Sequence, residues 1–300
     1  MHDLATDVEV PKEGQNLFQL RSLSFSYADG HRALQDIDLD IFPGDRIALV
    51  GQNGAGKTTL LRSLLGLCDC AGDIDVLGFD PRRERSRMLD RVCSIADTAV
   101  LPGWMSVKQV LDYVEGVHPR FDRSRALRFL DDTQVGLKRR IRELSKGMKV
   151  QLHLAIVMSV DARLLILDEP TLGLDIMFRK RFFEQLLNDY YDEQRTIIIS
   201  THQVDEIENI LTDVLFMRSG KILLNERMET ISERYLELHA VGEEIKAAAN
   251  LNPIGVRSIL GGKAFIFENT SRETLQGLGQ VKVPTVADLF VAKMEAEAGK

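Results

Sequence analysis

Residues 46–58 read RIALVGQNGAGKT. The apolar run Ile47 to Val50 predicts a short buried parallel strand, and the residues from Lys57 to about Gly66 predict a helix. The segment between them, GQNGAGKT, matches G-x-x-x-x-G-K-[ST]. In that setting the glycines let backbone N–H groups wrap a β-phosphate, the lysine neutralises phosphate oxygens, and the Thr58 hydroxyl ligates magnesium. The stretch therefore predicts a phosphate loop.

A pair of carboxylates follows another buried run. Leu164 to Leu167 are four aliphatic residues, and Asp168-Glu169-Pro170 come directly after them. The carboxyl end of a sheet strand is where ligands bind in such folds. Standing alone, the pair could be an ordinary solvated turn. Beside a phosphate loop it predicts that Asp168 holds the magnesium shell and that Glu169 orients and deprotonates the attacking water.

A second helix start has the features of an anion site. Residues 143–155 read ELSKGMKVQLHLA, in which an N-cap serine and a glycine precede an apolar run at helical spacing. Backbone N–H groups at a helix start attract anions. One chain thus carries two predicted phosphate-binding helix starts almost ninety residues apart.

Short apolar strands recur along the chain and alternate with helical stretches, which predicts an α/β fold with a largely parallel sheet. The further strands are VCSIA (92–96), LLILD (164–168), TIIIS (196–200) and DVLFM (213–217). His202 follows TIIIS, so it lies at the mouth of a strand of this sheet and could reach a γ-phosphate. A lone histidine is more often a surface or packing residue.

The rest of the chain divides by composition. Residues 1–14 read as a flexible tail, and the segments before residue 43 alternate as antiparallel strands with a turn at Ala28-Asp29-Gly30. Helical character dominates from about 97 to 160, which predicts an inserted helical subdomain. After residue 225 a strand, a helix, a hairpin around Gly261-Gly262 and a final helix predict a small α+β domain (226–300).

Composition limits the function classes. The net charge of −7 argues against non-specific nucleic-acid binding as the main task. Cys68, Cys70 and Cys93 fit free thiols in a reducing cytoplasm, and Cys68-Asp69-Cys70 has no second ligand pair that would favour a metal site. The N-terminal residues lack a signal-peptide pattern, and the longest apolar runs are too short to span a bilayer, so we expect a soluble protein.

Five motifs in this order resemble the nucleotide-binding subunit of an ATP-binding cassette (ABC) transporter, over roughly residues 17–225. They are the phosphate loop, the signature Leu144-Ser145-Lys146-Gly147-Met148, the acidic pair, Gly173-Leu174-Asp175, and His202. Tyr27 resembles the aromatic residue that stacks on adenine, although a strand aromatic that packs on the sheet would look the same. The resemblance implies ATP and Mg²⁺ as ligands and His202, with Lys57 and Glu169, as catalytic residues. It implies nucleotide contacts from the following residues: Tyr27, Gly51, Gln52, Asn53, Gly54, Ala55, Gly56, Lys57, Thr58, Thr59, Ser145, Gly147 and Asp175.

The resemblance also accounts for the two helix starts. In this family the signature helix of one cassette caps the γ-phosphate held by the phosphate loop of a second, antiparallel cassette, so the partner is a second copy or a paralogue. Lys146 stands where glycine is commonest and adds a cation. The glutamine that usually contacts magnesium aligns with Asp97, a further candidate metal ligand alongside Thr58 and Asp168, in a register that could shift by one residue.

We therefore expect an ATP-hydrolysing subunit that drives a separate transmembrane permease, peripheral at the cytoplasmic face of the membrane. LSKGM and TVADLFVAKME look most like cassettes of ABC-2-type exporters. The alternatives are a soluble cassette ATPase acting on DNA or ribosomes, and a small-molecule kinase. The chain lacks the long coiled-coil insertion or second cassette of the former, and a kinase has no use for the signature. Trp104, the only tryptophan, is expected either in a docking patch for the membrane subunit or in the core of the helical subdomain.

Overall fold

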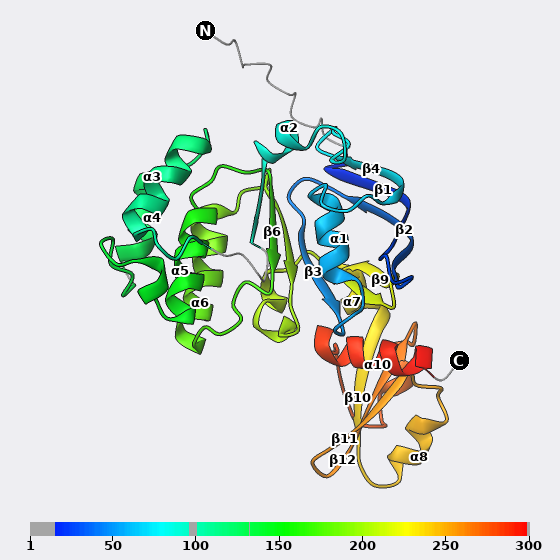
Figure 1. The fold of residues 1–300 in the computed structure, drawn as a ribbon. Coiled ribbons are helices and arrows are strands. Elements are labelled where there is room, and N and C mark those ends of the chain that lie inside the picture. Colours follow the sequence, from blue (N-terminus) through cyan, green and yellow to red (C-terminus); the bar gives the residue numbers. More distant parts are fainter. Residues whose placement is uncertain (1–15, 96–100, 132, 299–300) are drawn as a thin grey trace. The chain divides into compact units, whose positions relative to one another are not determined.

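The computed structural model describes residues 16–95, 101–131 and 133–298, and these form two compact units. The first unit contains residues up to Asp45 and Thr58–Ile198, and the second contains Arg46–Lys57 and Ile199 onward. Each unit therefore combines segments that are far apart in the sequence (Figure 1). The predicted tail, residues 1–14, lies outside the described residues.

An antiparallel sheet with strand order β2-β1-β4 belongs to the first unit. Its strands are β1 (Phe18–Ser26), β2 (Arg32–Ile41) and β4 (Ala71–Val76). β1 pairs with β2 from Phe18↔Ile41 to Ser26↔Arg32, and the turn between them is closed by Gly30 N donating to Tyr27 O. Phe18, Leu20 and Leu23 of β1 are buried, and the alternation shifts by one residue between Leu20 and Leu23, where the register with β2 also shifts.

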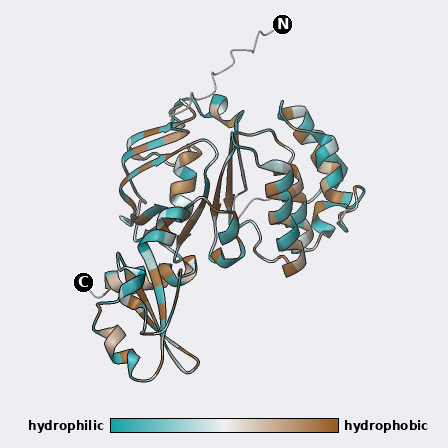
Figure 2. Cartoon of the chain, turned by 180° about the vertical axis from the view of Figure 1, so that it is seen from behind, coloured by the Kyte–Doolittle hydropathy of each residue, from teal (hydrophilic) through white to brown (hydrophobic). Residues whose placement is uncertain are grey.

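Parallel strand pairs occur in both units. In the first, β5 (Val92–Ile95) pairs with β6 (Leu164–Asp168). In the second, β3 (Arg46–Gly51) pairs with β8 (Asp213–Arg218), and β9 (Lys221–Arg227) pairs antiparallel with β8. β7 (Thr196–Ser200) and β6 are buried along their whole length, which explains their unbroken apolar sequences. Figure 2 shows these strands as hydrophobic and the helices as mixed in character. The predicted α/β fold is confirmed.

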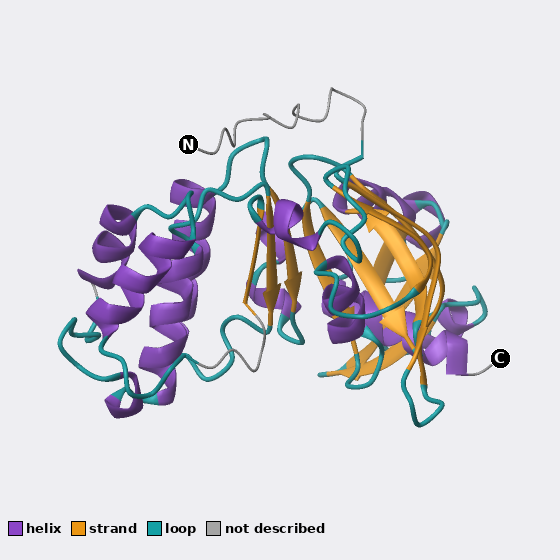
Figure 3. Ribbon diagram, turned by 45° about the horizontal axis from the view of Figure 1, so that its top comes forward, coloured by secondary structure: helices purple, strands orange, loops and turns teal. Residues whose placement is uncertain are grey.

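In the first unit, α2 and α5 contact β5. α3, α4 and α5 pack on one another (Figure 3), and a capping box of Ser106 and Gln109 fixes the start of α3. The elements are α1 (Lys57–Leu64), α2 (Arg85–Leu89), α3 (Val107–Val117), α4 (Arg123–Asp131), η1 (Ile141–Glu143), α5 (Lys146–Val157), α6 (Ile176–Gln185) and the π-helical η2 (Leu186–Tyr190).

The C-terminal part of the second unit is a four-stranded antiparallel sheet, order β11-β12-β10-β13, with helices beside it. Leu236, Leu238, Phe265 and Phe267 are the large side chains of its core. The elements of this part and of the segment before it are η3 (Val204–Glu206), η4 (Glu208–Ile210), α7 (Met228–Arg234), β10 (Tyr235–Ala240), α8 (Glu244–Ala249), β11 (Gly255–Ile259), β12 (Gly262–Glu268), α9 (Arg272–Leu275), β13 (Gln280–Lys282) and α10 (Val286–Ala298). Among the described residues, none of the helices has the length and apolar character needed to span a membrane.

Candidate functional site

The phosphate loop leaves β3 at Gly51 and enters α1 at Lys57. Gly51 faces Met217 in β8, and a Cβ at this glycine would lie 2.7 Å from the Met217 carbonyl oxygen, so no side chain fits. Gly54 and Gly56 have φ angles of 81° and 105°, in the left-handed region that glycine adopts readily. Lys57 is buried, and its Nζ donates to Gly51 O at 2.6 Å and to Gln52 O at 3.4 Å. The ammonium group therefore lies inside the loop.

Thr58 and Asp168 meet within the first unit. Thr58 Oγ1 donates to Asp168 Oδ2 at 2.9 Å, and Asp168 is a buried residue at the last position of β6. A hydroxyl and a carboxylate are hard oxygen ligands, and Mg²⁺ is usually held by one or two protein oxygens together with phosphates and water. The pair fits a magnesium ion that a nucleotide brings with it. Among the described residues no group of three or more His, Cys, Asp and Glu side chains forms a metal cage of its own.

Glu169 has a strained backbone. Its φ is 49°, a left-handed value that a non-glycine residue adopts at a cost of about 1–2 kcal/mol. The conformation turns the chain directly after β6, and Leu172 N donates to Glu169 O at 3.2 Å. Strain of this kind collects at functional sites, where the rest of the fold maintains it. The partly buried Glu169 side chain thus follows directly after the Asp168 ligand.

His202 lies in the second unit, which also contains the loop from Gly51 to Lys57. Thr201 N donates to Leu49 O at 3.4 Å, which places the residue before His202 beside β3, two residues before the loop starts. The His202 side chain is exposed, whereas Thr201 is buried. The strand mouth predicted from TIIIS therefore adjoins β3, whose end begins the loop.

Tyr27 follows β1 and lies near the start of α1. Its hydroxyl and Thr59 Oγ1 are 3.0 Å apart, and Phe25 contacts the ring edge-on. The residue remains 39% exposed, so a further planar group has access to it. Its ring also lies parallel to that of His31, with centroids 6.4 Å apart. Tyr27 is therefore fixed at its hydroxyl and still partly exposed, which differs from an aromatic buried in the sheet.

The signature segment starts α5. Ser145 is its N-cap, with the side-chain oxygen accepting from Met148 N at 3.2 Å. Because a hydroxyl both donates and accepts, the Ser145 O–H can still donate to an anion. A Cβ at Gly173 would contact the Lys146 side chain at 3.4 Å, and one at Gly147 would lie 3.7 Å from Gly173 O. The signature and the loop after Glu169 are therefore neighbours in one chain.

Asp175 caps the next helix and accepts from Phe178 N at 2.9 Å. The two residues after it, Ile176 and Met177, are 72% and 76% exposed. The sequence motif identified Asp175 but not these exposed apolar side chains. Their adjacency in the sequence to the aspartate was the signal that could have found them.

Three other sequence expectations have different outcomes. Asp97 lies outside the described residues. Trp104 is 69% exposed, so the alternative of a core tryptophan is wrong. The three cysteines are free thiols, and burial raises the pKa of Cys68 and Cys70 while Ser63 contacts Cys70 Sγ. Protonated thiols are poor metal ligands.

A loop wrapped around a lysine, with a threonine bonded to a strand-end aspartate, defines a phosphate-loop nucleotide-binding protein. Comparison with known proteins makes the class specific, because residues 34–172 match the ABC transporter family. The aliphatic sulfonates import ATP-binding protein SsuB of Cupriavidus necator is 34% identical over 205 residues, covering 67% of this chain and 66% of the relative. The Nod factor export ATP-binding protein I of Cupriavidus metallidurans is 29% identical over 271 residues, covering 84% and 86%.

The structural comparison agrees. The structure of cbiO1 from Clostridium perfringens, part of the ABC transporter complex cbiONQ, has 27% identity and a TM-score of 0.59 over 72% of this chain and 90% of that one. The chain is therefore an ATP-binding subunit of the ABC transporter family, and it is an ATPase.

Proposed function

We propose that residues 15–225 form the ATPase domain, with residues 226–300 as a small C-terminal domain, and that this chain hydrolyses MgATP to drive a separate permease. The backbone N–H groups of residues 51–58 and the Lys57 ammonium bind the phosphates. Thr58 and Asp168 hold magnesium, which supplies positive charge to the β- and γ-phosphate oxygens when it is bound. Asp97 is proposed as a further ligand from its place in the sequence.

Two residues act on the attacking water and the γ-phosphate. Glu169 orients the water and accepts its proton, and His202 donates a hydrogen bond to the γ-phosphate. Tyr27 stacks on the adenine, and Gln52, Asn53, Ala55 and Thr59 complete the cradle. The Thr58–Asp168 hydrogen bond carries this proposal, because it joins the phosphate loop to the strand end that bears the carboxylates.

Calorimetric titration tests the assignment. Glu169→Gln should bind MgATP with nearly unchanged affinity, whereas Lys57→Ala should lose detectable binding. Asn209→Ala, which changes an exposed residue away from these motifs, serves as the control. Equal binding by Lys57→Ala and wild type would refute the phosphate loop as the nucleotide site.

We further propose that two copies of the chain share two ATP sites, with Ser145 and Gly147 of each copy completing the site of the other. The exposed start of α5 and the exposed Ile176 and Met177 beside Asp175 support an interface here. Asp175, which holds the start of α6, would contribute from the same surface. A paralogous cassette is the alternative partner if this chain does not self-associate.

The proposed membrane partner is a permease on whose cytoplasmic side the chain would lie. Trp104 supports a docking surface, since exposed tryptophans are enriched where proteins bind partners. Trp104→Ala should leave basal ATPase intact and weaken binding to membranes that contain the permease. Recovery of the chain with DNA or ribosomes and without any membrane protein would favour a soluble ATPase instead.

We propose export as the direction. A match over 84% of the chain, as with the Nod factor export protein, must extend past residue 225 into the C-terminal domain. The similarities to importer subunits cover smaller shares of this chain, from 67% to 77%. ATP-dependent substrate accumulation in inside-out vesicles would support export, and accumulation in right-side-out vesicles would contradict it.

A further inference from the structure

The C-terminal helix α10 makes contacts on two of its faces. Residues 286, 290 and 294 are four apart and lie on one side of a helix. Val286 N donates to Glu208 Oε2 at 3.2 Å, the Phe290 ring lies edge-on to Phe216 of β8 with centroids 5.2 Å apart, and Met294 O accepts from Arg218 at 2.9 Å. This side of α10 thus contacts β8 and, through Glu208, the segment that follows His202.

The other face of α10 rests on the C-terminal sheet. Ala292 packs so closely on β11 that a Cβ at Gly255 would lie 2.4 Å from the Ala292 Cβ. Asp288 Oδ2 accepts from Arg257 Nη2 at 2.9 Å, and Lys293 Nζ donates to Glu268 at 2.9 Å. The helix is therefore fixed to β11 and β12 by packing and by two ion pairs.

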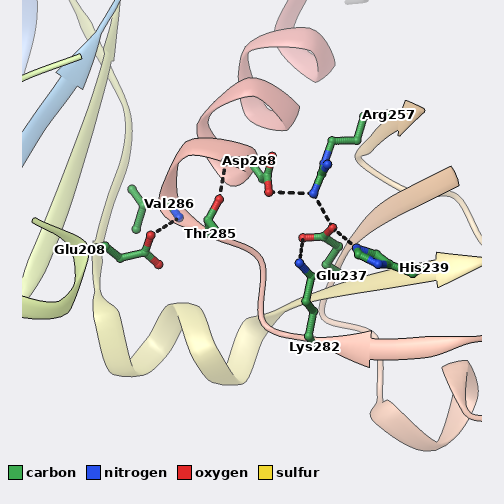
Figure 4. Close-up of polar contacts among 8 residues, drawn as sticks. All are labelled: Glu208, Glu237, His239, Arg257, Lys282, Thr285, Val286 and Asp288. Atoms are coloured by element: carbon green, nitrogen blue, oxygen red, sulfur yellow. Dashed lines mark hydrogen bonds and ion pairs between the residues drawn. The ribbon is translucent and has the colours of Figure 1, made fainter. Parts of the chain in front are cut away.

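A buried carboxylate strengthens this attachment (Figure 4). Glu237 of β10 is fully buried, and its Oε1 accepts from Arg257 at 2.7 Å, the same guanidinium that holds Asp288. His239 Nε2 lies 2.5 Å from that oxygen, and Lys282 Nζ lies 3.6 Å from Oε2. Removing one partner of such a buried group is strongly destabilising. Arg257 therefore links α10 to a buried charge cluster of the sheet.

Glu208 connects α10 to residues 204–210, the segment that follows His202. Residues 204–210 form the two 3₁₀ turns η3 and η4, with Val204, Ile207 and Ile210 buried. The Glu208 carboxylate accepts the first N–H of α10, and Thr285 Oγ1 accepts the N–H of Asp288. A carboxylate at a helix N-terminus interacts favourably with the helix dipole and with the exposed N–H groups. Glu208 and Val286 are 78 positions apart in the sequence.

We infer that Glu208 is a positioning residue for ATP hydrolysis. By accepting the first N–H of α10 it fixes residues 204–210, the segment that follows His202, to the C-terminal domain. This inference rests on the proposed role of His202. It also assigns residues 226–300 a task inside the catalytic cycle. Because Glu208 belongs to the segment that follows His202 and bonds to α10 rather than to the phosphate loop, its loss should slow turnover without weakening nucleotide binding.

The first test compares two Glu208 variants in the full-length protein. Glu208→Ala should lower kcat about tenfold, close to the smallest factor expected for a lost hydrogen bond to a charged group, with KM for ATP nearly unchanged. Glu208→Gln keeps a carbonyl oxygen that can accept the Val286 N–H, and should retain most of the wild-type kcat. Asn209→Ala, on the exposed neighbour in the same turn, is the matched control and should behave as wild type.

A second variant removes the same hydrogen bond from its other end. Val286→Pro deletes the donor at the first helical position, where proline is well tolerated. It should reproduce the loss of kcat, and adding Glu208→Ala to it should cause no further loss, as expected for two halves of one interaction. This variant also keeps the inference testable if Glu208→Ala fails to fold.

The outcomes separate this inference from the proposed function. A Glu208→Ala protein with wild-type kcat, beside an inactive His202→Ala protein, would overturn the positioning role and leave the catalytic assignment standing. Wild-type activity in both variants would overturn both. Faster hydrogen exchange of residues 204–210 in Glu208→Ala, together with rescue by glutamine, would support the positioning role.

Discussion

The two helix starts of this chain that carry phosphate-binding motifs differ in how they are held. At the start of α1, Lys57 bonds back to Gly51 and Thr58 bonds to Asp168, which is 110 residues away. At the start of α5, Ser145 Oγ accepts from Met148 N and Ser145 O accepts from Lys149 N, so both bonds stay within the first turn of the same helix. Lys57 at the first start is buried, whereas Ser145 and Lys146 at the second are exposed.

This difference supports the proposal that each start supplies half of a shared site. The phosphate loop would bind the nucleotide with groups of its own chain, and the exposed start of α5 would cap the nucleotide held by a second copy. The α5 start offers a serine hydroxyl, helical N–H groups and a lysine, with no carboxylate or metal ligand beside them in its motif. A second copy of the chain would supply the missing nucleotide.

The largest expected effect tests the phosphate-loop site. Glu169→Gln removes the proton acceptor at the end of β6, and turnover should fall by about 10²–10⁴ because general-base assistance is typically worth that factor. Affinity for MgATP should persist. Steady-state phosphate release and calorimetric binding measure the two quantities, and a turnover near wild type would remove Glu169 from the mechanism.

A smaller loss of hydrolysis should follow when Ser145 at the exposed start of α5 is changed. Ser145→Ala removes one donor to the γ-phosphate, and hydrolysis should fall by about a hundredfold, as for other preorganised donors. The nucleotide affinity of a single chain should not change. Ser145→Thr keeps the hydroxyl and the N-cap, so it should restore most activity; equal activity of the alanine variant and wild type would contradict a shared site.

Tyr27 gives an intermediate case at the margin of the first site. Tyr27→Ala should raise KM for ATP about three- to tenfold, since an aromatic stacking pair is worth about 0.5–1.5 kcal/mol. Tyr27→Phe loses only the contact with Thr59 Oγ1 and should change KM less. If KM for GTP rises as steeply as KM for ATP, the ring recognises any base; an unchanged KM in Tyr27→Ala would exclude stacking.

The smallest effect concerns the stability of α5. Burial lowers the pKa of His153, so the folded state disfavours the protonated ring. The stabilising difference is present above the unfolded pKa near 6.5 and is lost as the pH falls from there through the lower folded-state pKa, with a slope below about 1.4 kcal/mol per pH unit. Urea unfolding at pH 7.5 and 5.5 should show a smaller loss for His153→Gln than for wild type, and parallel curves would contradict this.

The strands that are buried along their whole length, β6 and β7, could be predicted from the sequence. β6 and β7 have the bounds that their aliphatic runs indicate, since charged or polar residues stop each run. β4 (AGDIDV) could not be found this way, because its first three residues are exposed. It is a strand because it pairs with β1. Local composition does not contain that partner.

The site shows the same limit. The residues of local motifs, such as Lys57, Thr58 and Asp168, could be found from spacing alone. The exposure of Trp104 could not, because a lone tryptophan fits a core and a surface equally. Glu208 was missed for a related reason, since its partner is the backbone N–H of Val286 and leaves no trace in the sequence pattern.

The most direct test of the half-site account is the mass of the chain in solution. With hydrolysis blocked by Glu169→Gln, bound ATP should bridge Lys57 of one copy and Ser145 of the other. Sedimentation velocity with MgATP should then show the mass of two chains, about 68 kDa from 33.8 kDa each. Without nucleotide, or with Ser145→Ala added, the protein should remain a single chain. A monomer at high protein concentration and saturating MgATP would contradict the account.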